Sequence, residues 1–289
     1  MDTSAVTDRA AVLIGAGELM SQIADGRPPA ILDVRWRLDR PDGLAAYLAG
    51  HIPGAVYVSL EDELSDHSRM GLGRHPLPSG PAVQVAARRW GIRQSQPVVV
   101  YDDWNRAGSS RAWWVLTAAG LGDVRILDGG LSDWTAAGGS LQAGAISPVP
   151  GDVTVDYDDL YSGGRPVLTA EQVAAGAEAT LLDARAPERF RGEVEPLDPV
   201  AGHIPGSRNL PSTSVLGIDG KFLPDARLMA MLAESGVGPQ SPVGAYCGSG
   251  VTASVVLAAL RAAGVNAALF PGSWSQWSGD HRPAATGPA

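Results

Sequence analysis

Cys247 is the only cysteine in this chain of 289 residues, and its sequence context is typical of a reactive thiol. It follows the apolar run PVGAY and precedes Gly-Ser-Gly and a stretch that predicts a helix beginning near Val251 or Thr252. A tight loop between a strand and a helix N-terminus turns backbone N–H groups and the positive end of the helix dipole inward, so it can bind an anion. A thiol there should be partly ionised, and Gly248 and Gly250 would let the backbone close around it. We therefore expect a nucleophile instead of the small buried hydrophobe that a lone cysteine often is.

The motif around Cys247 belongs to a repeat that organises the whole chain. Three blocks occur twice, in the same order and about 150 residues apart: ILDVRW and LLDARA with Asp33 and Asp183, GHIPGAV and GHIPGSR with His51 and His203, and VVVYDDW and VGAYCGS with Asp102 and Cys247. A weaker fourth pair aligns Trp134 with Trp277. The period is the size of a domain, which indicates a tandem duplication. The first copy has a carboxylate where the second has a thiol, so we expect it to be catalytically inactive.

The elements between these blocks alternate. Short apolar runs such as PVVVYD, VRILDGG and TLLDAR predict buried strands, and SSRAWWVLTAAG and VTASVVLAALRAAG predict helices that end at Gly120 and Gly264. The sequence predicts an α/β protein of two tandem domains, 1–140 and 166–289, each a parallel sheet with helices on both faces. Residues 141–165 are rich in Gly, Pro and Asp and predict a linker. We expect the loop after Asp102, DWNRAGSSR, to lack the backbone N–H groups that surround Cys247.

Composition narrows the possible partners and compartments. The net charge of −9 argues against nucleic acid and anionic membranes as partners, so an anionic substrate needs a local positive site. One cysteine excludes internal disulfides and cysteine-rich metal sites, and we expect no metal. The N-terminus carries Asp2 and Asp8 and lacks a basic start, and no run of 18 apolar residues occurs. We therefore expect neither a signal peptide nor a membrane span, and we expect a cytoplasmic protein.

The segment Cys-Gly-Ser-Gly-Val-Thr-Ala at 247–253 resembles the active-site loop of 3-mercaptopyruvate sulfurtransferases. The GHIPG blocks and Gly-Ser-Trp at 272–274 are further features of the tandem-domain rhodanese-like sulfurtransferases, and the resemblance covers nearly the whole chain. It implies that Cys247 carries sulfur as a persulfide, from a small anionic donor to a thiol or cyanide, without a cofactor. Thiosulfate-preferring relatives usually carry Arg-Lys where this chain has Gly248 and Ser249, so 3-mercaptopyruvate is the expected donor. A thiosulfate:cyanide sulfurtransferase and a non-autonomous sulfur carrier are the alternatives.

The resemblance also implies roles for particular residues. Ser249 matches a serine that acts with a histidine and an acid from the first domain, here His75 and Glu61, with Asp62 and Glu63 as neighbouring alternatives for the acid. A histidine could relay a proton through this serine as the enolate of pyruvate departs.

The remaining implied roles concern binding. Arg185 is expected to hold the donor carboxylate with help from Arg189, while Gly248, Gly250, Val251 and Thr252 line the substrate site. The sulfur acceptor would be a small thiol or a thioredoxin-like protein.

Two other interpretations are weaker. A phosphatase of related fold would need an arginine six residues after the cysteine, where this chain has Ala253. His51 and His203 recur in both copies, including the one without a cysteine, which favours a structural role over a metal site.

Overall fold

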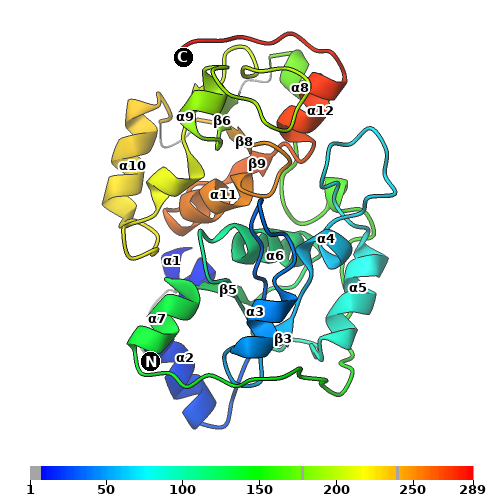
Figure 1. Cartoon of the computed structure of the whole chain (residues 1–289), viewed down its shortest axis with the longest axis vertical. Helices are drawn as coiled ribbons and strands as arrows, with labels where there is room; N and C mark the ends of the chain where they lie inside the picture. Colours follow the sequence, from blue (N-terminus) through cyan, green and yellow to red (C-terminus); the bar gives the residue numbers. More distant parts are fainter. Residues whose placement is uncertain (1–7, 177–178, 239–240, 289) are drawn as a thin grey trace, which may run out of the picture.

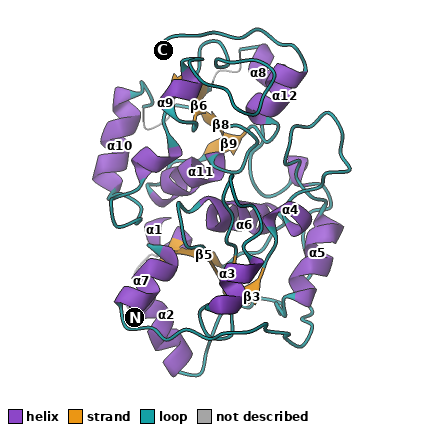
Figure 2. Ribbon diagram, viewed as in Figure 1, coloured by secondary structure: helices purple, strands orange, loops and turns teal. Residues whose placement is uncertain are grey.

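The computed structural model describes residues 8–176, 179–238 and 241–288, and it divides the chain into two α/β halves, one above the other in Figure 1. Residues 1–7, with part of the N-terminal segment in which we expect no signal peptide, lie outside the described residues. Each half contains one parallel sheet flanked by helices (Figure 2). Within the described residues no helix is long and apolar enough to cross a membrane.

The two sheets have related strand orders. The first is β1-β5-β4-β2-β3, and the second is β7-β6-β8-β9. Their strands are β1 (Leu13–Ile14), β2 (Ala30–Asp33), β3 (Val56–Tyr57), β4 (Val98–Tyr101), β5 (Val124–Leu127), β6 (Thr180–Asp183), β7 (Arg208–Asn209), β8 (Val243–Tyr246) and β9 (Ala267–Leu269). The repeat predicted from the sequence is visible in the register, because Asp33 lies opposite Tyr101 in the first sheet and Asp183 lies opposite Tyr246 in the second. The predicted α/β class, with two parallel sheets, is confirmed.

The helices cover both faces of each sheet. In the first half they are α1 (Asp8–Val12), α2 (Ala16–Ala24), α3 (Leu44–Ala49), α4 (Leu60–Glu63), α5 (Gly80–Arg89), α6 (Ala107–Ala118) and α7 (Gly130–Ala136). They continue with the short 3₁₀ helix η1 (Leu160–Ser162), α8 (Ala170–Ala174), α9 (Pro187–Phe190), η2 (Ser212–Val215), α10 (Asp225–Glu234), α11 (Ala253–Ala262) and α12 (Ser273–Gly279). The backbone after α6 and α11 turns through Gly120 and Gly264, which have φ of 102° and 82°, so both predicted left-handed helix ends are present.

Helices α6 and α11 occupy equivalent places in the two halves and pack against each other at the centre of the molecule (Figure 1). Both are buried on nearly all sides, so their apolar residues are not confined to one face. Trp113 and Trp114 of α6 belong to the same buried cluster as Val255 and Leu260 of α11. The interface between the halves is therefore part of the hydrophobic core.

Residues 141–165 run along the first half before the chain enters the second. The N–H of Gly80 donates to the carbonyl of Asp158 over 2.8 Å, and that of Gly164 donates to Ala118 over 2.8 Å. Just beyond this segment, Leu269 of β9 donates to the carbonyl of Pro166 over 3.0 Å, which attaches the chain to the second sheet.

Candidate active site

Cys247 lies where β8 ends, in a loop that closes around its sulfur. The N–H of Gly250 donates to Sγ over 3.2 Å, and Cys247 is only 1% exposed. Gly250 has a φ of +80°, and a Cβ there would lie 2.6 Å from the carbonyl oxygen of Pro271, so only glycine fits. Helix α11 begins at Ala253, slightly later than predicted, after Thr252 at its N-cap.

The segment 272–274 is hydrogen-bonded to this loop. The N–H of Cys247 donates to Oγ of Ser273 over 3.1 Å, and that of Trp274 donates back to the carbonyl of Cys247 over 3.0 Å. Ser273 adopts a φ of 53°, which is uncommon for a residue with a side chain. The loop position is thus fixed by side-chain and backbone bonds from the start of α12.

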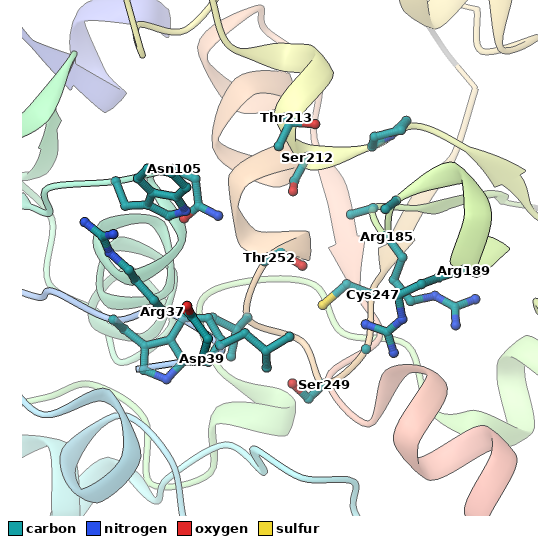
Figure 3. A pocket seen from close by; sticks show the side chains of 18 of the residues that line it. Arg37, Asp39, Asn105, Arg185, Arg189, Ser212, Thr213, Cys247, Ser249 and Thr252 are labelled. Atoms are coloured by element: carbon teal, nitrogen blue, oxygen red, sulfur yellow. The ribbon is translucent and has the colours of Figure 1, made fainter. Parts of the chain in front are cut away.

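A cavity of about 320 Å³ opens onto Cys247 between the two halves (Figure 3). From the second half it is lined by Ala184, Arg185, Ala186, Arg189, Pro211, Ser212, Thr213, Cys247, Gly248, Ser249, Val251 and Thr252. From the first half it is lined by Trp36, Arg37, Leu38, Asp39, Arg74, Trp104 and Asn105. Of the loop residues that we expected to line a substrate site, Gly248, Val251 and Thr252 do so, whereas Gly250 supplies its N–H to the sulfur.

A chain of hydrogen bonds leads from the cysteine loop into the first half. Oγ of Ser249 lies 2.7 Å from Nδ1 of His75, and Nε2 of His75 lies 3.1 Å from Oε1 of Glu61. The indole N–H of Trp36 donates to the same carboxylate oxygen over 2.7 Å, and Nε2 of His67 lies 3.2 Å from Oε2. The structure therefore brings together the serine, histidine and acid that the resemblance implied. Glu61, and not its neighbours, makes the contact with His75.

The ionisation states of Glu61 and His75 determine which atoms in this chain of hydrogen bonds carry protons. The hydrogen bond with His75 is the main reason that the pKa of Glu61 falls from 4.5 to about 2, so the carboxylate is ionised and can only accept. Burial lowers the pKa of His75 below its ordinary value and outweighs the opposing effect of Glu61. A neutral His75 must then carry its proton on Nε2, toward Glu61. Its Nδ1 is left to accept the hydroxyl proton of Ser249.

Arg185 lines the cavity, but most of its donors are occupied. Its guanidinium makes a two-pronged ion pair with Asp183, donates to the carbonyl of Gly202 over 2.7 Å, and lies 3.4 Å from Glu195. Arg35 makes the same contacts with Asp33 and Gly50 in the first half, where there is no cysteine. The repetition indicates that the Asp-x-Arg pair supports the loop after each strand.

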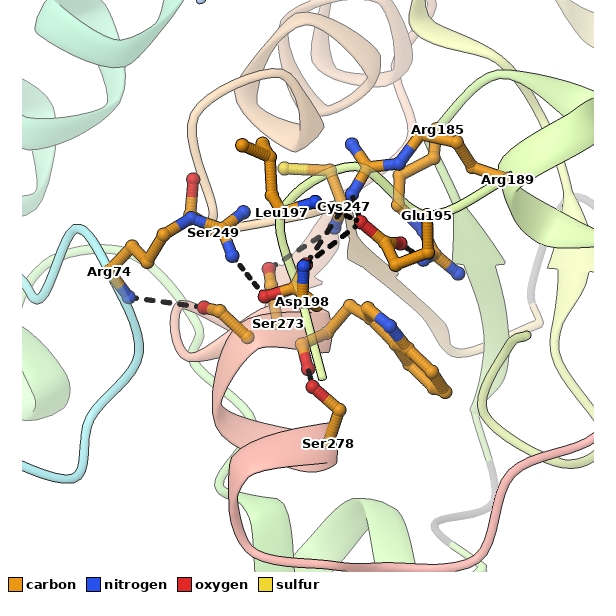
Figure 4. Close-up of polar contacts among 12 residues, drawn as sticks. Arg74, Arg185, Arg189, Glu195, Leu197, Asp198, Cys247, Ser249, Ser273 and Ser278 are labelled. Carbon is orange, nitrogen blue, oxygen red and sulfur yellow. Dashed lines mark hydrogen bonds and ion pairs between the residues drawn. The ribbon is translucent and has the colours of Figure 1, made fainter. Parts of the chain in front are cut away.

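Two other arginines face the cysteine loop. Arg189 bonds to Glu195 over 2.6 Å and lies 3.4 Å from Asp198, and Arg74, which comes from the first half, also pairs with Asp198 (Figure 4). Arg189 is a residue that we had expected here. Arg74 was missed, although it directly precedes His75 in the sequence.

Arg111 of α6 is a second contribution from the first half that the sequence did not reveal. Its guanidinium is fully buried and donates to the carbonyls of Leu64 and His75, both at 3.0 Å, and of Gly250 at 3.4 Å. Burial lowers its pKa to about 10. This side chain ties the histidine segment of one half to the cysteine loop of the other.

The equivalent loop of the first half is filled by its own carboxylate. Asp102 accepts from the backbone N–H groups of Trp104, Arg106 and Ser109 and from the hydroxyl of Ser109, and it pairs with Arg106 at 3.2 Å. The expectation that this loop lacks inward N–H groups is therefore wrong. The N–H groups are present, and an internal anion occupies them.

The two GHIPG histidines are buried structural residues. Nδ1 of His51 lies 2.9 Å from the carbonyl of Tyr47, and Nδ1 of His203 lies 2.7 Å from that of Phe190. Each imidazole also stacks on the ring of that same residue. Over residues 8–176, 179–238 and 241–288, no group of three or more His, Cys, Asp or Glu side chains is arranged to hold a metal.

Comparisons with known proteins agree with this architecture. A model of the Rhodanese-like domain matches residues 15–137 and again 169–280. SseB of Mycobacterium tuberculosis, provisionally named a thiosulfate sulfurtransferase, is 63% identical over 97% of this chain and 99% of its own length. The 3-mercaptopyruvate sulfurtransferase of Escherichia coli is 37% identical over 80% of this chain and 81% of its own. The crystal structure of SseA from Escherichia coli superimposes with a TM-score of 0.78 at 36% identity, covering 91% of this chain and 98% of that one.

These matches confirm the resemblance inferred from the sequence, including the duplication, since the domain model matches both halves separately. The relatives share sulfur transfer as their named activity, while their names differ in the donor. The chain belongs to the rhodanese family and is a two-domain sulfurtransferase.

Proposed function

We propose that this protein is a 3-mercaptopyruvate sulfurtransferase in which Cys247 carries the sulfur as a persulfide. The observation that carries the proposal is the hydrogen-bonded chain from Ser249 through His75 to Glu61 beside the cysteine loop. A proton relay is useful for a donor whose leaving group must be protonated on carbon. Sulfite, the leaving group of thiosulfate, needs no such proton.

The first half-reaction moves one sulfur atom and leaves the proton count unchanged. The thiolate of Cys247 attacks the donor sulfur, an S–S bond forms, and the C–S bond breaks with its electron pair going to carbon as the enolate of pyruvate. The donor thiol proton passes through Ser249 and Nδ1 of His75 and ends on the enolate carbon, which gives pyruvate. Glu61 stabilises His75 while it carries the extra proton. The N–H of Gly250 stabilises negative charge on the sulfur.

The cationic side chains and the backbone around the Cys247 loop bind the donor. Arg189 is suited to the donor carboxylate, because guanidinium groups bind carboxylates through two parallel hydrogen bonds, and Arg185 lines the same cavity. Gly248, Val251 and Thr252 form the wall of the cavity next to the reacting sulfur.

The second half-reaction returns the cysteine to its thiolate form. A small thiol, a thioredoxin-like protein or cyanide attacks the outer sulfur of the persulfide, and the electron pair of the S–S bond returns to Cys247. The chain has no second thiol, so the acceptor must come from outside it. A free cysteine suits a reducing compartment such as the cytoplasm.

Thiosulfate is the second candidate donor. It is supported by the name of the 63% identical relative and by the arginines that line the cavity beside Cys247. The two donors differ in their need for a proton, which makes them separable by experiment.

The test is a donor-resolved assay of Ser249→Ala and His75→Gln, with cyanide as the acceptor. Losing the relay should lower kcat for 3-mercaptopyruvate by about 10²–10⁴-fold and leave thiosulfate turnover within a fewfold of the parent protein. Cys247→Ser should abolish both activities, and intact-protein mass should show one added sulfur only when Cys247 is present. Equal losses with both donors would refute the relay, and turnover by the Cys247→Ser protein would refute the persulfide.

A further inference from the structure

We infer that Arg74, from the half without a reactive cysteine, is a specificity-determining residue that forms an anion subsite with Arg189 beside Cys247. The subsite is suited to the sulfonate group of thiosulfate, whose leaving group, sulfite, is a dianion. The inference rests on the proposed chemistry at Cys247, but it concerns a different donor group from the one that the Ser249 relay serves.

The geometry centres on Gly248, the residue after the cysteine. A Cβ at this position would lie 3.0 Å from Nη2 of Arg74, and 3.5 and 3.8 Å from Nη1 and Nη2 of Arg189. Two guanidinium groups from different halves of the molecule therefore converge on one point next to the reacting sulfur. Both side chains also line the cavity onto which Cys247 opens.

The bonds of Arg74 leave part of its guanidinium available. Its backbone N–H donates to Oγ of Ser275 over 3.1 Å, and Nη1 pairs with Asp198, while Nη2 faces the loop (Figure 4). The side chain of Asp198 is almost fully buried, and its ion pair with Nη1 holds Arg74 in place. Arg185 differs, because its ion pair with Asp183 and its bond to a carbonyl occupy it within its own half.

The chemistry of thiosulfate explains why such a pair matters. The thiolate of Cys247 attacks the outer sulfur, the S–S bond of thiosulfate breaks, and the electron pair leaves with sulfite, so one thiolate and one dianion become one persulfide anion and one dianion. Both negative charges of the leaving group remain throughout the step. Fixed cations beside Cys247 stabilise this dianionic leaving group, whereas 3-mercaptopyruvate brings one negative charge and depends on proton transfer.

The glycine at position 248 therefore does not mean that the surroundings of Cys247 lack positive charge. A side chain at 248 would project into the space that Arg74 and Arg189 approach. The charge that residue 248 itself does not carry is supplied across the interface by Arg74.

The experiment measures kcat/KM for both donors in Arg74→Gln, Arg74→Lys and a control, Arg69→Gln. Arg69 belongs to the same loop and is similarly exposed, 34% against 31%, but it stacks on Tyr161 and does not line the cavity. Loss of a charge-assisted bond should lower kcat/KM for thiosulfate about ten- to a hundredfold in Arg74→Gln. The value for 3-mercaptopyruvate should fall less than threefold, Arg74→Lys should recover part of the thiosulfate activity, and Arg69→Gln should leave the ratio of the two donors unchanged.

Inhibition by sulfate gives a second measurement that does not require thiosulfate to react. Sulfate should inhibit 3-mercaptopyruvate turnover by the parent protein at constant ionic strength, and this inhibition should weaken about tenfold or more in Arg74→Gln. Absence of thiosulfate turnover in the parent protein, or equal losses with both donors in Arg74→Gln, would overturn the inference. Failure of the Ser249 relay test would leave this result standing, because the thiosulfate and sulfate measurements do not involve that relay.

Discussion

Replacing Gly250 with alanine tests whether the loop around Cys247 is held in one conformation. The left-handed backbone at +80° costs a residue with a side chain about 1–2 kcal/mol. The added Cβ would lie 2.6 Å from the carbonyl oxygen of Pro271, a backbone atom, and forcing an extra group into a packed site adds about 1–3 kcal/mol. We expect Gly250→Ala to be about 2–5 kcal/mol less stable than the parent protein.

Two assays read the effect. Urea unfolding followed by tryptophan fluorescence should report the stability loss, and thermal unfolding should show a Tm lower by about 3–8 °C. Alkylation of the single cysteine by iodoacetamide should slow, because relief of the clash moves the Gly250 N–H away from Sγ. The control is Gly248→Ala, where the backbone is not left-handed and the nearest atom is the flexible tip of Arg74, so the cost should stay below about 1 kcal/mol. Equal stability and equal alkylation rates for the two variants would refute this account of the loop.

Three further outcomes are expected. Glu61→Gln removes a carboxylate that raises the pKa of His75, so the acid limb of kcat/KM for 3-mercaptopyruvate should move to lower pH. A limb that stays in place or moves to higher pH would contradict this. Asp102→Cys should bind no second sulfur, since residue 102 does not line the cavity between the halves, and a gain of two sulfur atoms in intact-protein mass would show otherwise. Arg185→Ala leaves the buried carboxylate of Asp183 without its partner, and urea unfolding should show a loss of about 3–5 kcal/mol; a loss below 1 kcal/mol would disprove the supporting role.

The sequence predicted the parts of the site that depend on local chain order. Cys247 could be placed in a loop between a strand and a helix because the apolar run, the glycines and the helical stretch are neighbours in the chain. The positions of Ser249, His75 and Glu61 followed from the resemblance, since the serine and the histidine are 174 residues apart and only the fold brings them to 2.7 Å.

The contributions that were missed all cross the molecule. Arg74 and its partner Asp198 are 124 residues apart in the sequence, and Arg111 and Gly250 are 139 residues apart. No local sequence pattern predicts contacts between residues so far apart. Arg185 is different, because the repeat did contain a signal. Its counterpart Arg35 follows an aspartate in the copy without a cysteine, which favours a structural role for both arginines.

The shared core has a consequence for how the protein folds and unfolds. Helices α6 and α11 bury each other, and α1 at the start of the described chain packs on α11 near the other end. Arg9 reinforces this closure, with bonds to the carbonyls of Phe222 and Leu223 and an ion pair with Asp225. Each half buries apolar surface of the other, so the duplicated units act as one cooperative folding unit. A fragment of residues 166–289 would expose the apolar face of α11 to water and would be prone to aggregate.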